Sequence, residues 1–155
     1  MKSHYSTFDA ERILEIKRTR LQEWLDRNYI VPFHKAKGKG DKTRFVIEDL
    51  YKIKLFQEFL DRRIKQRERA AYLLSILDKE ATSPTEEPRK VDWGRDYFSY
   101  IEFSHDEHPK LKDEPNFTGS YHDKFPSHDM EDHHIFQIII NLKVIKRLVD
   151  KNFWK

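Results

Sequence analysis

Cationic side chains are concentrated in one short segment, residues 35–44. Half of its ten residues are Lys or Arg, namely Lys35, Lys37, Lys39, Lys42 and Arg44. Gly38 and Gly40 lie among them and permit a tight reversal of the chain. Positive charges at this density repel one another unless an anion is close, and the phosphates of a nucleic acid are such anions. The alternative interpretation is a flexible, solvated surface loop.

A second candidate surface lies on a helix expected at residues 18–27. The apolar residues that follow helical spacing, and should therefore face the core, are Leu21, Trp24 and Leu25. The candidate binding residues on or beside this helix are Lys17, Arg18, Thr19, Arg20, Gln22 and Glu23. The amide of Gln22 can form paired hydrogen bonds with adenine, or it can simply be solvated. Glu23 can accept a hydrogen bond from cytosine, although a pair with Arg27 one turn later is favoured.

Histidines form a third cluster, because six of the eight lie between residues 105 and 134. They are His105, His108, His122, His128, His133 and His134. Acidic residues are interleaved with them, and imidazole together with carboxylate ligands can hold zinc, nickel or iron. The spacing matches no defined metal site, so we assign no metal and no cofactor. A pH sensor and a polar mobile loop are the alternative interpretations.

The sequence offers no support for catalysis. The two glycines of the cationic segment lack the strand-to-helix context of a phosphate-binding loop, and no serine lies in a nucleophile elbow. The absence of cysteine excludes disulfides and a cysteine nucleophile, and it is compatible with a reducing cytoplasm. No apolar run approaches the roughly 18 residues of a membrane helix. We therefore expect a cytoplasmic protein that is neither an enzyme nor embedded in a membrane.

The order of the expected elements places the two candidate surfaces in one domain. These elements are a helix from Ser6 or Thr7, the helix at 18–27 with a stop at Asn28, a strand after Pro32, a return strand at 43–46, and helices at 48–59 and 67–79. Two helices that cross at a tight turn, followed by a hairpin wing, make a winged helix–turn–helix. We therefore expect an α+β fold whose N-terminal part has four helices and a β-hairpin wing.

The second half of the chain is expected to be a separate module. Residues 81–90 combine prolines and hydroxyl residues without an apolar period, which is typical of a linker. Residues 91–155 are expected to form a small strand–loop–strand–helix module, with strands at 97–104 and 133–142 and a helix at 142–153. The module is interpreted as a dimerisation or effector unit, as a site for a protein partner, or as a core of its own.

Charge follows the same division of the chain. Residues 1–80 hold 19 Lys and Arg against 13 Asp and Glu, a net charge of +6. Residues 81–155 hold 11 against 14, a net charge of −3. The basic part is therefore the expected winged helix–turn–helix, and a basic surface attracts polyanions such as DNA.

Residues 5–78 resemble the DNA-binding domain of the MerR family of bacterial regulators. The segments that carry the resemblance are Leu21-Gln22-Glu23-Trp24, Tyr29-Ile30-Val31-Pro32, Arg44-Phe45, Glu48-Asp49-Leu50, and Arg62-Arg63-Ile64 ahead of Arg67-Glu68-Arg69-Ala70-Ala71. The resemblance implies that Trp24 packs in the core and that the helix bearing Gln22 reads the major groove. It also implies phosphate contacts from Lys37, Lys39, Lys42 and Arg44. Because Gln22 and Glu23 stand where the family often has arginine and tyrosine, base preference does not carry over.

The expected function is therefore a transcriptional regulator that binds double-stranded DNA, with a possible homodimer or protein partner formed through the C-terminal module. An excisionase-like factor that bends DNA is one alternative. A protein-interaction adaptor that kept the winged helix but lost DNA contact is another.

Overall fold

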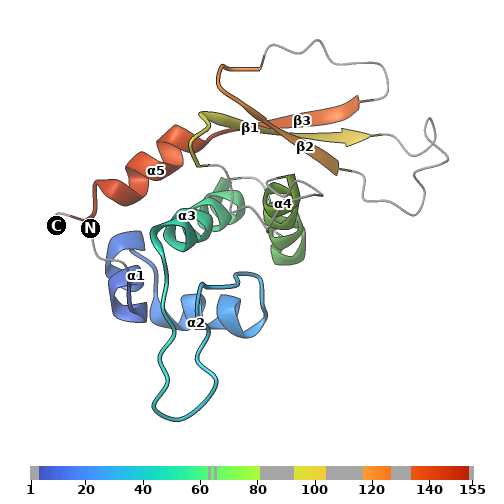
Figure 1. Ribbon diagram of the computed structural model, residues 1–155. Coiled ribbons are helices and arrows are strands. Elements are labelled where there is room, and N and C mark those ends of the chain that lie inside the picture. Colours follow the sequence, from blue (N-terminus) through green and yellow to red (C-terminus); the bar gives the residue numbers. More distant parts are fainter. Residues whose placement is uncertain are drawn as a thin grey trace, which may run out of the picture. The chain divides into compact units, whose positions relative to one another are not determined.

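A computed structural model describes residues 4–62, 64, 66–80, 93–103, 117–126 and 134–153 of the 155-residue chain. Within these residues the helices are α1 (Thr7–Leu14), α2 (Arg18–Asp26), α3 (Ile47–Arg62), α4 (Arg67–Glu80) and α5 (Leu142–Asp150), and the strands are β1 (Tyr97–Phe103), β2 (Phe117–His122) and β3 (His134–Asn141) (Figure 1). The expected α+β class is confirmed. The expected linker at 81–90 lies outside the described residues.

The contacts of the chain divide it into two compact units. The first consists of residues 1–71 together with 144–155, and the second of residues 72–143. This division differs from the expected boundaries, because most of α5 belongs with the N-terminal residues and most of α4 belongs with the strands.

The first unit begins with a helix whose start is set by local hydrogen bonds. Ser6 precedes α1, and its Oγ accepts a hydrogen bond from the Asp9 backbone N–H at 3.2 Å. Asp9 reciprocates, since its Oδ2 accepts from the Ser6 backbone N–H at 2.9 Å. This capping box satisfies two N–H groups that the helix leaves without partners, and it confirms the expected start of the helix.

Helix α2 packs through the residues that helical spacing had indicated. Leu21, Trp24 and Leu25 are all buried, and the Trp24 ring meets the Phe56 ring of α3 edge-on at 4.7 Å. After α2, Asn28 adopts a left-handed conformation with a φ of 56°, which asparagine tolerates better than most residues. The expected buried face and the expected stop of this helix are both confirmed.

Helix α5 completes the first unit through polar contacts near its end. The Asn152 side chain donates a hydrogen bond to the Ile13 carbonyl at 2.8 Å, and the Tyr51 hydroxyl donates to Asp150 at 3.0 Å. Burial raises the pKa of the Tyr51 hydroxyl, and the Asp150 carboxylate adds to the rise, so this donor keeps its proton. These partners lie 99 and 139 residues away in sequence, which explains why the pattern of α5 alone did not place it here.

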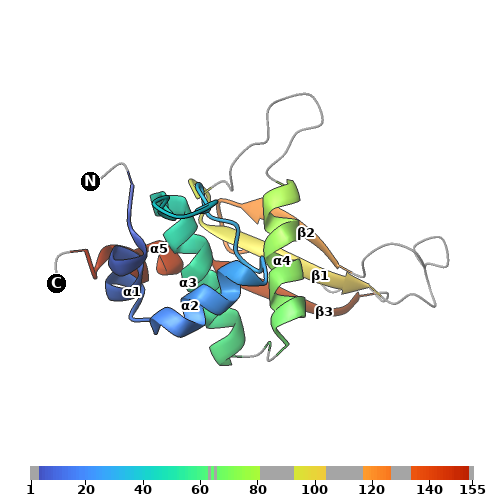
Figure 2. The same ribbon diagram turned by 90° about the horizontal axis from the view of Figure 1, so that it is seen from below.

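The second unit is built on an antiparallel sheet with the strand order β2-β1-β3. Strand β2 was not expected, because it lies in the polar stretch that sequence analysis had interpreted as a loop. On the central strand β1, the side chains of Phe98, Ser99 and Tyr100 are all fully buried. Figure 2 shows α4 lying across one face of this sheet. The Tyr100 hydroxyl donates to the α4 carbonyl of Leu73 at 2.7 Å, which fastens the strand to the helix.

Among the residues that the structure describes, no helix has the length and apolar character needed to cross a bilayer.

Candidate functional site

The basic loop, residues 35–44, joins α2 to α3 without regular strands. The two short strands expected around it are wrong, since the described residues there form only isolated bridges, His34 to Arg44 and Tyr5 to Phe45. The first bridge has backbone hydrogen bonds of 3.1 and 2.9 Å. Two glycines near the turn disfavour a longer ladder, so the loop depends on other contacts for its shape.

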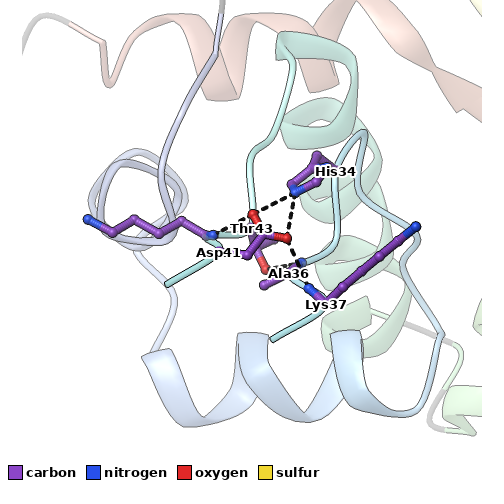
Figure 3. A network of polar contacts seen from close by, with 6 residues as sticks. His34, Ala36, Lys37, Asp41 and Thr43 are labelled. Atoms are coloured by element: carbon purple, nitrogen blue, oxygen red, sulfur yellow. Dashed lines mark hydrogen bonds and ion pairs between the residues drawn. The ribbon is translucent and has the colours of Figure 1, made fainter. Parts of the chain in front are cut away.

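Asp41 is the centre of the polar contacts at the tip of the loop (Figure 3). Its carboxylate accepts hydrogen bonds from the backbone N–H groups of Lys37 at 3.0 Å and Lys42 at 2.9 Å. The His34 Nε2 lies 2.9 and 3.0 Å from the two carboxylate oxygens. Gly40 adopts a φ of +91°, which a residue with a side chain rarely adopts. The Asp41 carboxylate therefore orders this turn, a role that paired β-strands have in a regular hairpin.

A second carboxylate, that of Asp49, joins the two ends of the loop. Its Oδ2 accepts from the backbone N–H of Phe33 at 2.8 Å and from that of Val46 at 3.0 Å. Asp49 lies in the first turn of α3, so the same carboxylate also satisfies the N–H that precedes the helix. Burial raises the pKa of Asp49, although both backbone hydrogen bonds act to lower it.

Removing the Asp49 carboxylate should destabilise the first unit. We expect Asp49→Ala to lower the free energy of unfolding by about 2–4 kcal/mol, because two partly buried N–H groups lose their acceptor. Asp49→Asn should lose much less, since its carbonyl oxygen can still accept and no buried charge remains. Urea unfolding of both variants checks this. Equal losses for Ala and Asn would show that the acceptor is not what matters.

The cations of the loop differ in what they contact. Lys37, Lys39, Lys42 and Arg44 all have exposed side chains. Lys35 instead directs its ammonium group at the end of α2, where it donates to the Leu25 carbonyl at 2.7 Å and to the Asn28 side chain at 2.9 Å. Lys35 thus adds a hydrogen bond to a carbonyl at the helix end, which also accepts from the Asn28 backbone N–H at 3.2 Å, and it joins the loop to α2.

The outward face of α2 forms an open, shallow depression. It is lined by Arg18, Thr19, Gln22, Glu23, Asp26 and Arg27. Four of these, Arg18, Thr19, Gln22 and Glu23, were candidate site residues. Asp26 and Arg27 were not among the predicted site residues, although they lie four residues after Gln22 and Glu23 and so share their face. The Gln22 amide donates to the Asp26 carboxylate at 2.9 Å.

Glu23 is held by arginines rather than left available. The expected pair with Arg27 is present at 3.8 Å, and Arg67 at the start of α4 is a second, closer partner. Arg27 is also held by Tyr29, and the hydrogen bond between them raises the pKa of the Arg27 guanidinium. Arg27 therefore stays charged at the edge of the depression.

Two further candidates lie away from the depression. The Arg20 guanidinium stands over the Trp24 ring at 5.2 Å and lies 3.7 Å from the Asp61 carboxylate. The contact with Trp24 lies within α2, and the contact with Asp61 links α2 to α3. Lys17 is exposed immediately before α2 and makes no side-chain cap there.

The start of the basic loop is attached to the end of α2 in the first unit. Figure 1 shows the loop extending below α2. The hydrogen bonds of Lys35 to the end of α2 are consistent with this arrangement. The loop contributes five cations and one acid, whereas the α2 depression has two arginines and two acids. The positive charge of the joint surface is therefore concentrated on the loop.

The histidine cluster falls largely outside the described residues. His122 is described, and its Nε2 lies 2.9 Å from the Ser99 hydroxyl and 3.0 Å from the Ser120 hydroxyl. No group of three or more possible metal ligands occurs in the described part of the chain.

Comparison with protein-family models finds no family that matches this chain, and comparison with curated proteins finds no significant match.

Proposed function

We propose that this protein binds double-stranded DNA through the first unit and regulates transcription, as a MerR-like winged helix–turn–helix protein in the cytoplasm. The observation that carries the proposal is the basic loop, whose exposed lysines lie on a segment that is hydrogen-bonded through Lys35 to the end of α2, the helix that bears the depression. A helix fits the width of a major groove, and a cationic loop beside it can reach the flanking phosphates.

The two parts of this surface have different roles in the proposal. Lys37, Lys39, Lys42 and Arg44 contact phosphates, which supplies affinity without reading sequence. Arg18, Thr19 and Gln22 face base edges, and Arg27 joins them at the end of the same face. Base edges in the major groove present a distinct pattern of donors and acceptors, so these side chains set the sequence preference.

Three of the sequence candidates have other roles in this proposal. Lys35 fastens the loop to α2, Arg20 holds α2 to α3, and Glu23 accepts from two arginines. Their substitution should affect the shape and stability of the surface more than direct contact with DNA.

Selection of bound fragments from random duplex DNA tests the proposal. We expect enrichment of a defined sequence and an affinity that falls steeply as salt rises. A palindromic selected site, together with a solution mass of two chains, would show that a homodimer binds. Failure to bind any duplex at low salt would contradict DNA binding and favour the adaptor function. A large bend angle over tandem sites would favour the excisionase-like function instead.

Gln22 is the sharpest test of sequence reading. We expect Gln22→Ala to change the selected sequence at one or two positions while general affinity falls by less than roughly tenfold, because one amide contributes about 1–3 kcal/mol of discrimination. Repeating the selection with this variant measures the change. Gln57→Ala is a matched control, since it makes the same change on α3, outside the depression and the loop. An unchanged sequence profile for Gln22→Ala would remove Gln22 from the reading surface.

A further inference from the structure

Asp41 is the one acidic residue in the stretch from Val31 to Val46. Its position is unexpected for a surface that attracts phosphate, because a carboxylate among five cations weakens their field. A role in charge alone would therefore favour a neutral residue here. The contacts of Asp41 suggest what the carboxylate does instead.

The carboxylate binds the chain on both sides of the turn. It accepts from the backbone N–H of Lys37, which precedes the glycines, and from that of Lys42, which follows them. The Asp41 backbone N–H also donates to the Gly38 carbonyl at 3.2 Å. Fixing the backbone of two lysines fixes the direction in which each side chain leaves it. Figure 3 shows the Lys37 side chain extending away from the carboxylate.

The carboxylate is also held in its charged form. The hydrogen bond from His34 and those from the Lys37 and Lys42 backbone lower the pKa of Asp41 below its ordinary value. A charged acceptor forms stronger hydrogen bonds with backbone N–H groups than a neutral one does. The turn is therefore ordered before any ligand arrives. The Asp41 carboxylate provides this order, since the nearest strand pairing is a single bridge between His34 and Arg44.

We propose that Asp41 is a positioning residue, which orders the basic loop so that Lys37 and Lys42 meet DNA phosphates without a further cost of ordering. The inference rests on the proposed function, since it requires phosphate as the ligand. Its physical basis is preorganisation: a loop that is ordered in advance loses less conformational entropy on binding. Asp41 itself makes no contact with DNA.

The sign of the effect separates positioning from simple electrostatics. Asp41→Ala removes one negative charge from the loop, and electrostatics alone predicts tighter binding to DNA. Positioning predicts weaker binding, by roughly three- to tenfold, because two lysine side chains and their backbone must be ordered on binding. Asp123→Asn is the control, since Asp123 is exposed in the second unit, and its substitution makes the same change in net charge outside the loop and α2. The control should bind as tightly as wild type or slightly more tightly.

A double-mutant cycle with the lysines completes the experiment. In a chain that already carries Lys37→Ala and Lys42→Ala, adding Asp41→Ala should no longer weaken binding to a duplex probe. Amide hydrogen exchange at residues 37 and 42 should accelerate in the single Asp41→Ala variant, because the loop has lost its order. Amides of the core should exchange as slowly as in wild type, because the core remains folded. Wild-type protein that binds no duplex would overturn the proposed function and this inference together. Two outcomes would overturn this inference alone. In the first, wild type binds duplex DNA and the Asp41→Ala variant binds it equally or more tightly. In the second, Asp41→Ala weakens binding just as much in the chain that lacks Lys37 and Lys42.

Discussion

Replacing Lys37, Lys39 and Lys42 together with alanine should lower the affinity for duplex DNA by roughly two to three orders of magnitude near about 0.1 M salt. Each neutralised phosphate contributes about 0.9 to the slope of log affinity against log salt concentration. The slope should therefore fall by about 2.7, and the loss of affinity should be similar for all sequences. Titrations of one specific and one unrelated duplex at several salt concentrations measure both quantities.

A second triple variant controls for the loss of three charges. Lys124, Arg147 and Lys151 are exposed and lie outside the loop and α2. Replacing these three with alanine changes net charge by the same amount, and we expect the salt slope to remain close to that of wild type. If the two triple variants lost the same slope, the loop would have no special part in phosphate contact.

Trp24→Ala should strongly destabilise the first unit. The side chain is fully buried, and its ring packs edge-on against Phe56 at 4.7 Å. Removing a buried tryptophan typically costs about 3–5 kcal/mol, which is a large part of the roughly 5–15 kcal/mol that stabilises a domain. We expect the folded population and DNA binding to decline together. Urea unfolding measured by far-ultraviolet circular dichroism checks the loss.

Trp24→Phe separates packing from hydrogen bonding at this position. Phenylalanine keeps an aromatic contact with Phe56 and removes the indole N–H, which is buried and has no partner among the described residues. The variant should therefore lose only about 1–2 kcal/mol, because no hydrogen bond is broken. A loss as large as that of Trp24→Ala would mean that the indole N–H has a partner of real importance.

The helices of the first unit could be predicted because their signals are local. Ser6 and Asp9 lie three residues apart, which is the spacing of a capping box, and Asn28 stands where α2 ends. Helical spacing alone placed Trp24 in the core. Strand β2 could not be found in this way, because its polar sequence has no apolar alternation and its pairing depends on the distant strand β1.

The candidate surface could be predicted only in part, for the same reason. Composition revealed the cations of the loop, and spacing revealed the outward face of α2. The role of Lys35 depends on the carbonyl of Leu25, ten residues earlier, and that of Asp49 on Phe33, sixteen residues earlier. Such contacts depend on the tertiary fold, and no local sequence pattern predicts them. The role of Asp41 could likewise not be predicted, because the sequence shows it only as one acid among five cations.

The attachment of Lys35 to the end of α2 has a consequence for protein engineering. A loop grafted alone onto another scaffold would leave its ammonium group without the helix carbonyl and the Asn28 amide oxygen that receive it. The smallest transplantable piece therefore runs from the start of α2 to the first turn of α3, where Asp49 closes the loop. Within that segment, the helix and the loop would keep the hydrogen bonds that join them, so they should be transferred together.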